Sequence, residues 1–456
     1  MSLLMTLFFL VFLGFFAISD STLIITQKPS LSLSVARTNF ATVSAGELVF
    51  FAGGCTVAST CPMNVTNSVE IYNTNTDQWS SAVLSVARAN LAAASAGDFV
   101  LFAGGEYCYY INFTQVCVAL DAVDIYQIST NTWSVATLSQ ARTRIGATSA
   151  NGLIFFAGGK TDPGNFFGPS SNVIDVFDTS SQTWSTKALS IARSDIAAAA
   201  SGNNVLFAGG LVTTVGTRKF EIYNIASQQW KMGNLPDPTL EPAAASVGRF
   251  IFITAGTNYF VNHNTDVFYV YDVDTNSLYT MYLLMPYYYL AIASTPTEGA
   301  VVFGGFTHAG FPLVEIYEVS TGDWYYIYNL THRIRFKMVS SGNKIFFAEG
   351  QNNTPGAPIV NIIEVFEIQA INNNTSPQNP QSPNVPIPSS SSSPPNPITP
   401  SPSGPSPNLP SLNIPSIPYV PGILQNPSLI PQVSKSSGLD ILNSLLFCII
   451  CLLSLM

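Results

Sequence analysis

The sequence predicts an all-β fold, a seven-bladed β-propeller in which each blade is a sheet of four antiparallel strands. All five tryptophans follow an aromatic residue by seven positions, and an apolar run closing on two glycines precedes each pair. The unit recurs about every 50 residues, which indicates an internal repeat. The pairs are Tyr72/Trp79, Tyr126/Trp133, Phe177/Trp184, Tyr223/Trp230 and Tyr317/Trp324. The double glycines are Gly53-Gly54, Gly104-Gly105, Gly158-Gly159, Gly209-Gly210 and Gly304-Gly305.

The first repeat shows how one unit is built. Residues 40–45 and 47–52 read as two strands joined by a turn at Gly46, residues 68–72 read as a third strand, and Trp79 opens a fourth. Short strands separated by tight turns, without a helical period, favour an antiparallel all-β unit. Four such strands make one propeller blade.

Two degenerate copies complete the count, and neither has its tryptophan. Ala255-Gly256 with Tyr271 and Leu278 forms the fifth repeat, and Gly350 with Phe366 belongs to the seventh. The chain turns polar soon after Phe366, so the outermost strand of the seventh repeat must come from elsewhere.

The N-terminus offers that missing strand. Aligning Arg37 on Arg88 places Lys28 where Trp79 stands, so the β-branched run Thr22 to Gln27 takes the fourth-strand position. Pairing the two ends of the domain removes an open sheet edge. We therefore predict seven blades closed by an N-terminal strand, with six blades as the alternative.

The repeat resembles the kelch family over roughly 350 residues. The resemblance rests on the double glycine, an aromatic residue preceded by a carboxylate, and the tryptophan seven positions later. The carboxylate elements are Glu70-Ile71-Tyr72, Asp124-Ile125-Tyr126, Asp175-Val176-Phe177, Glu221-Ile222-Tyr223 and Glu315-Ile316-Tyr317. A recurring Ala-Arg precedes the first strand at Arg37, Arg88, Arg142 and Arg193. We interpret these arginines and carboxylates as scaffold pairs.

The sequence predicts a propeller at residues 20–372, with a targeting signal at each end of the chain and a stalk before the second signal. Residues 1–19 are apolar and end in small residues, as in a signal peptide, so the mature chain is expected to start near Asp20. Residues 373–435 are rich in Pro and Ser and predict a disordered or extended stalk.

Residues 436–456 have the pattern of a GPI-anchor signal, with Ser434, Ser436 and Ser437 as candidate attachment sites. A short transmembrane segment is the alternative, because a spanning helix needs about 20 apolar residues. The expected location is the outer surface of the plasma membrane, with attachment through a lipid.

Four cysteines remain in the mature chain, Cys55, Cys61, Cys108 and Cys117, and their proximity favours two local disulfides among the three possible connectivities. A secreted chain can also carry N-glycans. The acceptor sites are Asn64, Asn112, Asn329, Asn352, Asn373 and Asn374.

The composition narrows the possible partners. Only 9% of the residues are charged and the net charge is −9, which argues against nucleic-acid binding. The long loops after the glycines in repeats one to three are the expected functional surface of a monomeric propeller. Their aromatic residues predict a patch that binds an extracellular glycan or protein, unless these rings pack inside their own loops. These residues are Tyr107, Tyr109, Tyr110, Phe113, Phe166 and Phe167.

The resemblance also raises an enzymatic alternative, because kelch propellers include galactose oxidase, a secreted copper enzyme. That chemistry needs two histidines, two tyrosines and a tyrosine–cysteine crosslink. This chain has only His263, His308 and His332, and its cysteines are expected to be paired. No other catalytic motif occurs, so we predict a binding or adhesion module with no catalytic residue, metal or cofactor. A passive surface-coat protein is the further alternative.

Overall fold

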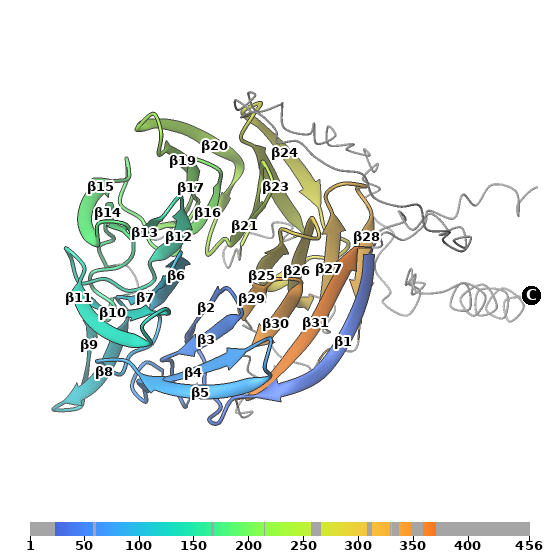
Figure 1. The fold of residues 1–456 in the computed structure, drawn as a ribbon. Coiled ribbons are helices and arrows are strands. Elements are labelled where there is room, and N and C mark those ends of the chain that lie inside the picture. Colours follow the sequence, from blue (N-terminus) through green and yellow to red (C-terminus); the bar gives the residue numbers. More distant parts are fainter. Residues whose placement is uncertain are drawn as a thin grey trace, which may run out of the picture.

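The computed structural model describes residues 23–57, 61–165, 168–213, 215–256, 266–307, 312–328, 330, 337–348 and 359–370. Within these ranges every regular element is a β-strand. Seven sheets stand in a ring around a central axis (Figure 1). The structure therefore confirms the seven-bladed propeller.

Blades 1 to 3 follow the predicted order of four strands. Blade 1 consists of β2 (Ala41–Ala45), β3 (Leu48–Ala52), β4 (Ser68–Asn73) and β5 (Gln78–Val83). Blade 2 consists of β6 (Ala92–Ala96), β7 (Phe99–Ala103), β10 (Ala122–Gln127) and β11 (Thr132–Thr137). Blade 3 consists of β12 (Gly146–Ala150), β13 (Leu153–Ala157), β14 (Val173–Asp178) and β15 (Thr183–Ala188).

Blades 4 to 6 keep this order, although the repeat that forms blade 5 lacks its tryptophan. Blade 4 consists of β16 (Ala197–Ser201), β17 (Asn204–Ala208), β19 (Val215–Asn224) and β20 (Gln229–Thr239), with β18 (Leu211–Val212) added beside β19. Blade 5 consists of β21 (Ala244–Val247), β22 (Phe250–Thr254), β23 (Val267–Asp272) and β24 (Ser277–Tyr282). Blade 6 consists of β25 (Tyr287–Thr295), β26 (Ala300–Thr307), β27 (Pro312–Glu318) and β28 (Trp324–Ile327).

Blade 7 joins the two ends of the domain, as predicted. It consists of β29 (Lys337–Ser341), β30 (Lys344–Ala348), β31 (Ile362–Ala370) and β1 (Leu23–Ser32). In Figure 1, β1 lies along the outer side of β31. One detail of the prediction is wrong, because Gln27, not Lys28, lies opposite Phe366 in the position of the tryptophans. A bulge between Lys28 and Leu31 inserts one extra residue, which alignment on Arg37 could not register.

Seven hydrophobic clusters hold the ring together, and each lies between two neighbouring blades. Between blades 1 and 2, the Tyr126 ring packs 5.6 Å from the Phe50 ring. Trp133 on the outer strand β11 covers Tyr126 from outside, at 5.0 Å, and is only partly buried. The Tyr or Phe of each predicted pair is thus a buried core residue. The tryptophan lies on the outer strand and shields this core residue from solvent.

Buried arginines clamp each of the first four blades to the connection that enters it. Arg88 has no exposed surface, and its guanidinium donates to Asp124 at 2.8 Å and to the carbonyl of Phe102 at 3.1 Å. The other Asp124 oxygen accepts the backbone N–H of Ser85, at 2.7 Å, from the connection between blades 1 and 2. Arg37–Glu70, Arg142–Asp175 and Arg193–Glu221 repeat the pair. The prediction of scaffold pairs is confirmed.

The two faces of the ring differ. One, the long-loop face, carries the connections between second and third strands and those between blades; the other, the tight-turn face, carries the short hairpin turns. Leu23 is paired with Ala370, whose backbone N–H donates to Glu298 in the turn between β25 and β26. Both ends of the described domain therefore lie on the tight-turn face.

Candidate functional site

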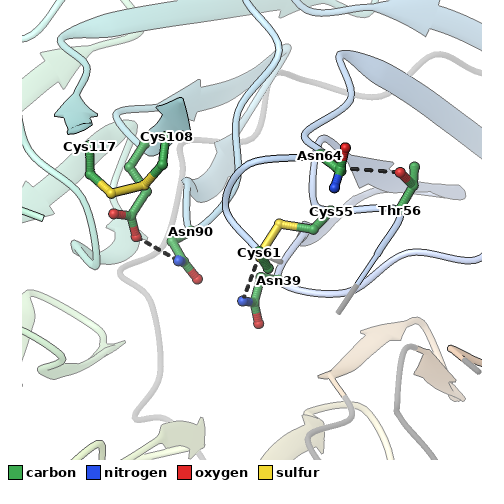
Figure 2. Close-up of a disulfide and its surroundings, with 9 residues drawn as sticks. Asn39, Cys55, Thr56, Cys61, Asn64, Asn90, Cys108 and Cys117 are labelled. Atoms are coloured by element: carbon green, nitrogen blue, oxygen red, sulfur yellow. Dashed lines mark hydrogen bonds between the residues drawn. A yellow bond between two sulfur atoms is a disulfide. The ribbon is translucent and has the colours of Figure 1, made fainter. Parts of the chain in front are cut away.

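Three long loops on blades 1 to 3 form one continuous ridge on the long-loop face. Both predicted disulfides lie in it, Cys55–Cys61 in the first loop and Cys108–Cys117 in the second (Figure 2). The backbone N–H of Cys108 donates to the carbonyl of Pro62 at 2.9 Å, and Gly164 of the third loop packs beside Cys117. We call residues 55–57, 61–67, 106–121, 160–165 and 168–172 the loop ridge.

The second loop is more ordered than predicted. It forms a hairpin of β8 (Glu106–Ile111) and β9 (Thr114–Ala119), in which Cys108 and Cys117 face each other. Asn112 and Phe113 make the turn with positive φ angles of 47° and 64°. Such left-handed angles are unusual for phenylalanine. The disulfide and the contact with Pro62 hold this hairpin in place.

Three of the four predicted aromatic residues of the hairpin are exposed, whereas the fourth, Tyr107, is half-buried. Tyr109 is 40% exposed, Tyr110 is 61% exposed, and Phe113 at the tip is fully exposed. Tyr107 stacks on Tyr109, with ring centroids 5.9 Å apart. Phe166 and Phe167, predicted to join this patch, lie outside the described residues.

A second feature of this face was not predicted from the sequence. The central channel opens here into a cavity of about 490 Å³. Its rim carries one residue from each of blades 1 to 5, directly before or near the first strand, and all five have φ between 52° and 57°. We call these residues the collar: Asn39, Asn90, Arg144, Asp195 and Glu241.

The left-handed backbone of the collar has a structural cause. The N–H of Asn90 donates to the carbonyl of Asn39 at 2.9 Å, the N–H of Arg144 to that of Asn90 at 3.2 Å, and the N–H of Asp195 to that of Arg144 at 3.1 Å. These bonds run from blade to blade around the channel. They hold the backbone of four of the five collar residues in place.

Two charged residues beside the collar, Glu106 and Lys160, are buried. Glu106 is buried and accepts the Asn90 amide at 2.6 Å. Burial raises the pKa of Glu106 despite this bond. Burial, with Arg144 nearby, lowers the pKa of Lys160. Arg144 and Asp195 form an ion pair at 3.7 Å. In Figure 2 the amide nitrogen of Asn39 points to Cys61.

The sequence does contain a signal for the collar. Each of Asn39, Asn90, Arg144 and Asp195 stands two positions after a clamp arginine. The side chain at this position is an amide in blades 1 and 2, a cation in blade 3 and an anion in blade 4. A search for repeated residue types therefore does not find it. It becomes visible only when the same structural position is compared around the ring.

The other predicted sites fall partly outside the described residues. Of the predicted glycan acceptors, Asn64 lies in the loop ridge and Asn112 at the hairpin tip. The remaining acceptors and the candidate anchor serines lie outside the described residues: Asn329, Asn352, Asn373, Asn374, Ser434, Ser436 and Ser437. The histidines His263, His308 and His332 lie outside as well. Among the described side chains, no group of three or more His, Cys, Asp or Glu is placed to hold a metal ion. The same ranges contain no apolar helix of membrane-spanning length.

A family model for the kelch motif matches residues 36–83. The match starts beside Arg37 and ends with β5, so it covers blade 1. A search of curated proteins found no significant match. Propellers of this kind serve as binding and protein-interaction modules and are commonly non-enzymatic. The kelch motif in blade 1 and the ring of seven four-stranded blades together support a kelch-repeat β-propeller.

Proposed function

We propose that this protein is a non-enzymatic cell-surface binding or adhesion module that holds an extracellular protein with its loop ridge. The observation that carries the proposal is the β8–β9 hairpin, which presents Tyr109, Tyr110, Ile111 and Phe113 to solvent on a disulfide-stapled support. Large exposed apolar side chains on a rigid element are typical anchors of protein interfaces.

A protein partner fits the hairpin better than a glycan does. Sugar recognition needs an aromatic platform together with directed polar groups, whereas Ile111 and Phe113 add apolar surface at the tip. The hairpin is held by a disulfide and by the neighbouring Pro62 loop, so little conformational entropy is lost when a partner binds.

The position of the chain ends supports display of this face. Leu23 and Ala370 lie on the tight-turn face, so a stalk at residues 373–435 would leave the propeller opposite the loop ridge. With a lipid anchor from the signal at 436–456, the ridge then points away from the membrane. The proposed location and anchor rest on the sequence of these segments.

The test is cell adhesion by the full-length chain displayed on cells. We expect Tyr110→Ser with Phe113→Ser to lower attachment to partner-bearing cells about tenfold or more, because truncating interface anchors costs about 2 kcal/mol or more. Tyr282→Ser is the matched control, since Tyr282 on β24 is also exposed but lies outside the ridge. Equal adhesion by all variants would instead favour a passive surface coat.

The anchor is tested separately on the same cells. Phosphatidylinositol-specific phospholipase C should release the displayed propeller into the medium if the C-terminal tail has been exchanged for a glycolipid. Full retention after treatment would favour the short membrane segment.

A glycan array probed with the soluble protein shows whether the hairpin variants change sugar binding.

A further inference from the structure

We propose, resting on the function proposed above, that Phe113 is the anchor residue of the loop ridge and enters an uncharged apolar pocket on the partner protein. Phe113 lies at the tip of the β8–β9 hairpin. Two observations point to this side chain. The backbone of the turn disfavours phenylalanine, and the ring is exposed to solvent rather than packed in the domain.

The turn between β8 and β9 favours glycine at the position of Phe113. Ile111 and Thr114 are paired, so Asn112 and Phe113 form a two-residue turn, and both have positive φ. Such turns prefer asparagine at the first position and glycine at the second. Asn112 therefore fits its position, whereas the Cβ atom of Phe113 makes the left-handed backbone costly. Every other non-glycine residue with positive φ in the described ranges is polar.

Packing of the Phe113 ring does not offset this cost. The ring is 101% exposed, whereas Phe50 and Phe102 in the cluster between blades 1 and 2 have no exposed surface. An apolar ring in water and a strained backbone both oppose folding, and they occur here in one residue. Strained residues cluster at sites that bind ligands or partners. Binding to another molecule therefore explains this residue better than stability of the domain does.

The hairpin presents Phe113 on a rigid and uncharged support. The Cys108–Cys117 disulfide joins the two strands, and the Cys108 N–H donates to the carbonyl of Pro62 at 2.9 Å. Residues 107–120 contain no charged side chain, although the chain has a net charge of −9. In Figure 1 the hairpin projects beyond β10 and β11 of its own blade. The partner surface that receives the tip therefore needs neither positive nor negative groups.

The shape of the tip selects a recessed surface on the partner. A two-residue turn is narrow, so the Phe113 ring leads, and Tyr109 and Tyr110 follow behind it. Tyr109 and Tyr110 are neighbours in a strand and point to opposite faces of the hairpin. A pocket that takes the Phe113 ring brings both tyrosines to its rim, where their hydroxyls can form hydrogen bonds. A flat surface would meet the leading ring alone.

The decisive variants relax the turn and remove the ring together. Phe113→Gly and Phe113→Asn introduce residues that tolerate a left-handed backbone. Both keep the glycan acceptor sequence from Asn112 to Thr114, so a change in adhesion cannot come from loss of that acceptor. We expect hydrogen exchange of the hairpin amides to slow about threefold or more in Phe113→Gly. Adhesion should fall about tenfold or more in both variants.

A third variant distinguishes a pocket from a flat contact. Phe113→Tyr keeps the ring and adds one hydroxyl. In a closed apolar pocket this hydroxyl is buried without a partner, so adhesion should fall about tenfold. On a flat surface the hydroxyl would stay in water and adhesion would not change.

Gln182→Gly is the matched control for turn relaxation. Gln182 has φ of 54° and lies in the turn between β14 and β15, on the tight-turn face. The control should slow exchange in its own turn and leave adhesion unchanged. A loss of adhesion in Phe113→Gly then cannot be attributed to relief of backbone strain.

The assay measures attachment of cells that display the full-length chain to unmodified cells of the species that produces it. Protease treatment of the unmodified cells should abolish attachment, because the pocket belongs to a protein. Hydrogen exchange is followed by mass spectrometry on the purified full-length chain. Attachment by the parent and each variant is compared at equal display.

Three results would overturn the anchor: unchanged adhesion of Phe113→Gly, adhesion of Phe113→Tyr equal to the parent, or faster exchange in the Phe113→Gly hairpin. If Tyr110→Ser still lowers attachment in that case, binding through the loop ridge stands without the anchor. No attachment by the parent, or attachment that survives protease treatment, contradicts the proposed function as well. The two proposals are therefore told apart by how they fail.

Discussion

At the scale of single residues, each arginine clamp ties one of the first four blades to the connection that enters it. The guanidinium of Arg88 has no exposed surface and binds a carboxylate and two backbone carbonyls at once. Burial lowers the pKa of the equivalent Arg193 to about 10, which still leaves it charged at neutral pH. A buried charge of this kind is tolerated only while its partner is present.

Arg88→Ala should therefore destabilise the propeller by about 3 to 5 kcal/mol, because Asp124 is left buried without its cation. Urea unfolding measures the change. Lys28→Ala, which removes the half-exposed ion pair with Glu367, should cost about 1 kcal/mol or less. An equal cost for both variants would contradict the clamp. The double variant Arg88→Met with Asp124→Leu should recover much of the loss.

Blade 6 lacks the clamp arginine and uses Tyr287 in its place. The Tyr287 hydroxyl donates to Glu315 at 2.7 Å, and the backbone N–H of Leu284 donates to the same carboxyl group at 2.9 Å. Burial without a cation outweighs these bonds and raises the pKa of Glu315 to about 7. The unfolded chain releases this proton near the ordinary glutamate value of 4.5.

Stability should consequently fall as the pH rises from about 5 to about 8, because the unfolded state binds fewer protons than the folded state in this window. Glu315 alone accounts for up to about 3 kcal/mol. Glu315→Gln removes this contribution, so the free-energy difference between variant and parent should change by that amount across the window. Parallel pH profiles from urea unfolding would refute the assignment.

At the scale of elements, β1 completes a blade that the rest of the chain leaves one strand short. It pairs with β31 from Leu23 to Ser32 and brings Leu23 and Ile25 to the cluster between blades 6 and 7. Without it, β31 would expose an unpaired edge, and such edges pair with other chains.

A chain that begins at residue 33 should therefore melt at a lower temperature and associate in solution. Adding a synthetic peptide of the β1 sequence, Leu23–Ser32, should restore the monomer and raise the melting temperature, since the peptide can occupy the vacant edge. A scrambled peptide is the control. Light scattering and calorimetry record both effects, and a truncated chain that is as stable as the parent would show that β1 is dispensable.

At the scale of the whole molecule, the repeat spacing was sufficient to predict the ring, its seven blades and the closing strand. Double glycines and the carboxylates two residues before the aromatic residue recur together in five of the seven repeats, so they can be found as residue types. The exposure of Trp79, at 37%, could not be predicted, because it depends on how far the neighbouring blade reaches. The collar was missed for the opposite reason, since Asn90, Arg144 and Asp195 share a backbone conformation but differ in chemistry.

The pairing of β1 with β31 near the exit of the chain also has a mechanical consequence. A pull transmitted through the chain beyond Ala370 acts along the axis of β31, which is bonded to β30 on one side and to β1 on the other. The ladders are then loaded in shear, so many hydrogen bonds must break together and forced unfolding is slow. The strand β1, which closes the ring, therefore also resists forced unfolding of the domain when the chain beyond Ala370 is pulled.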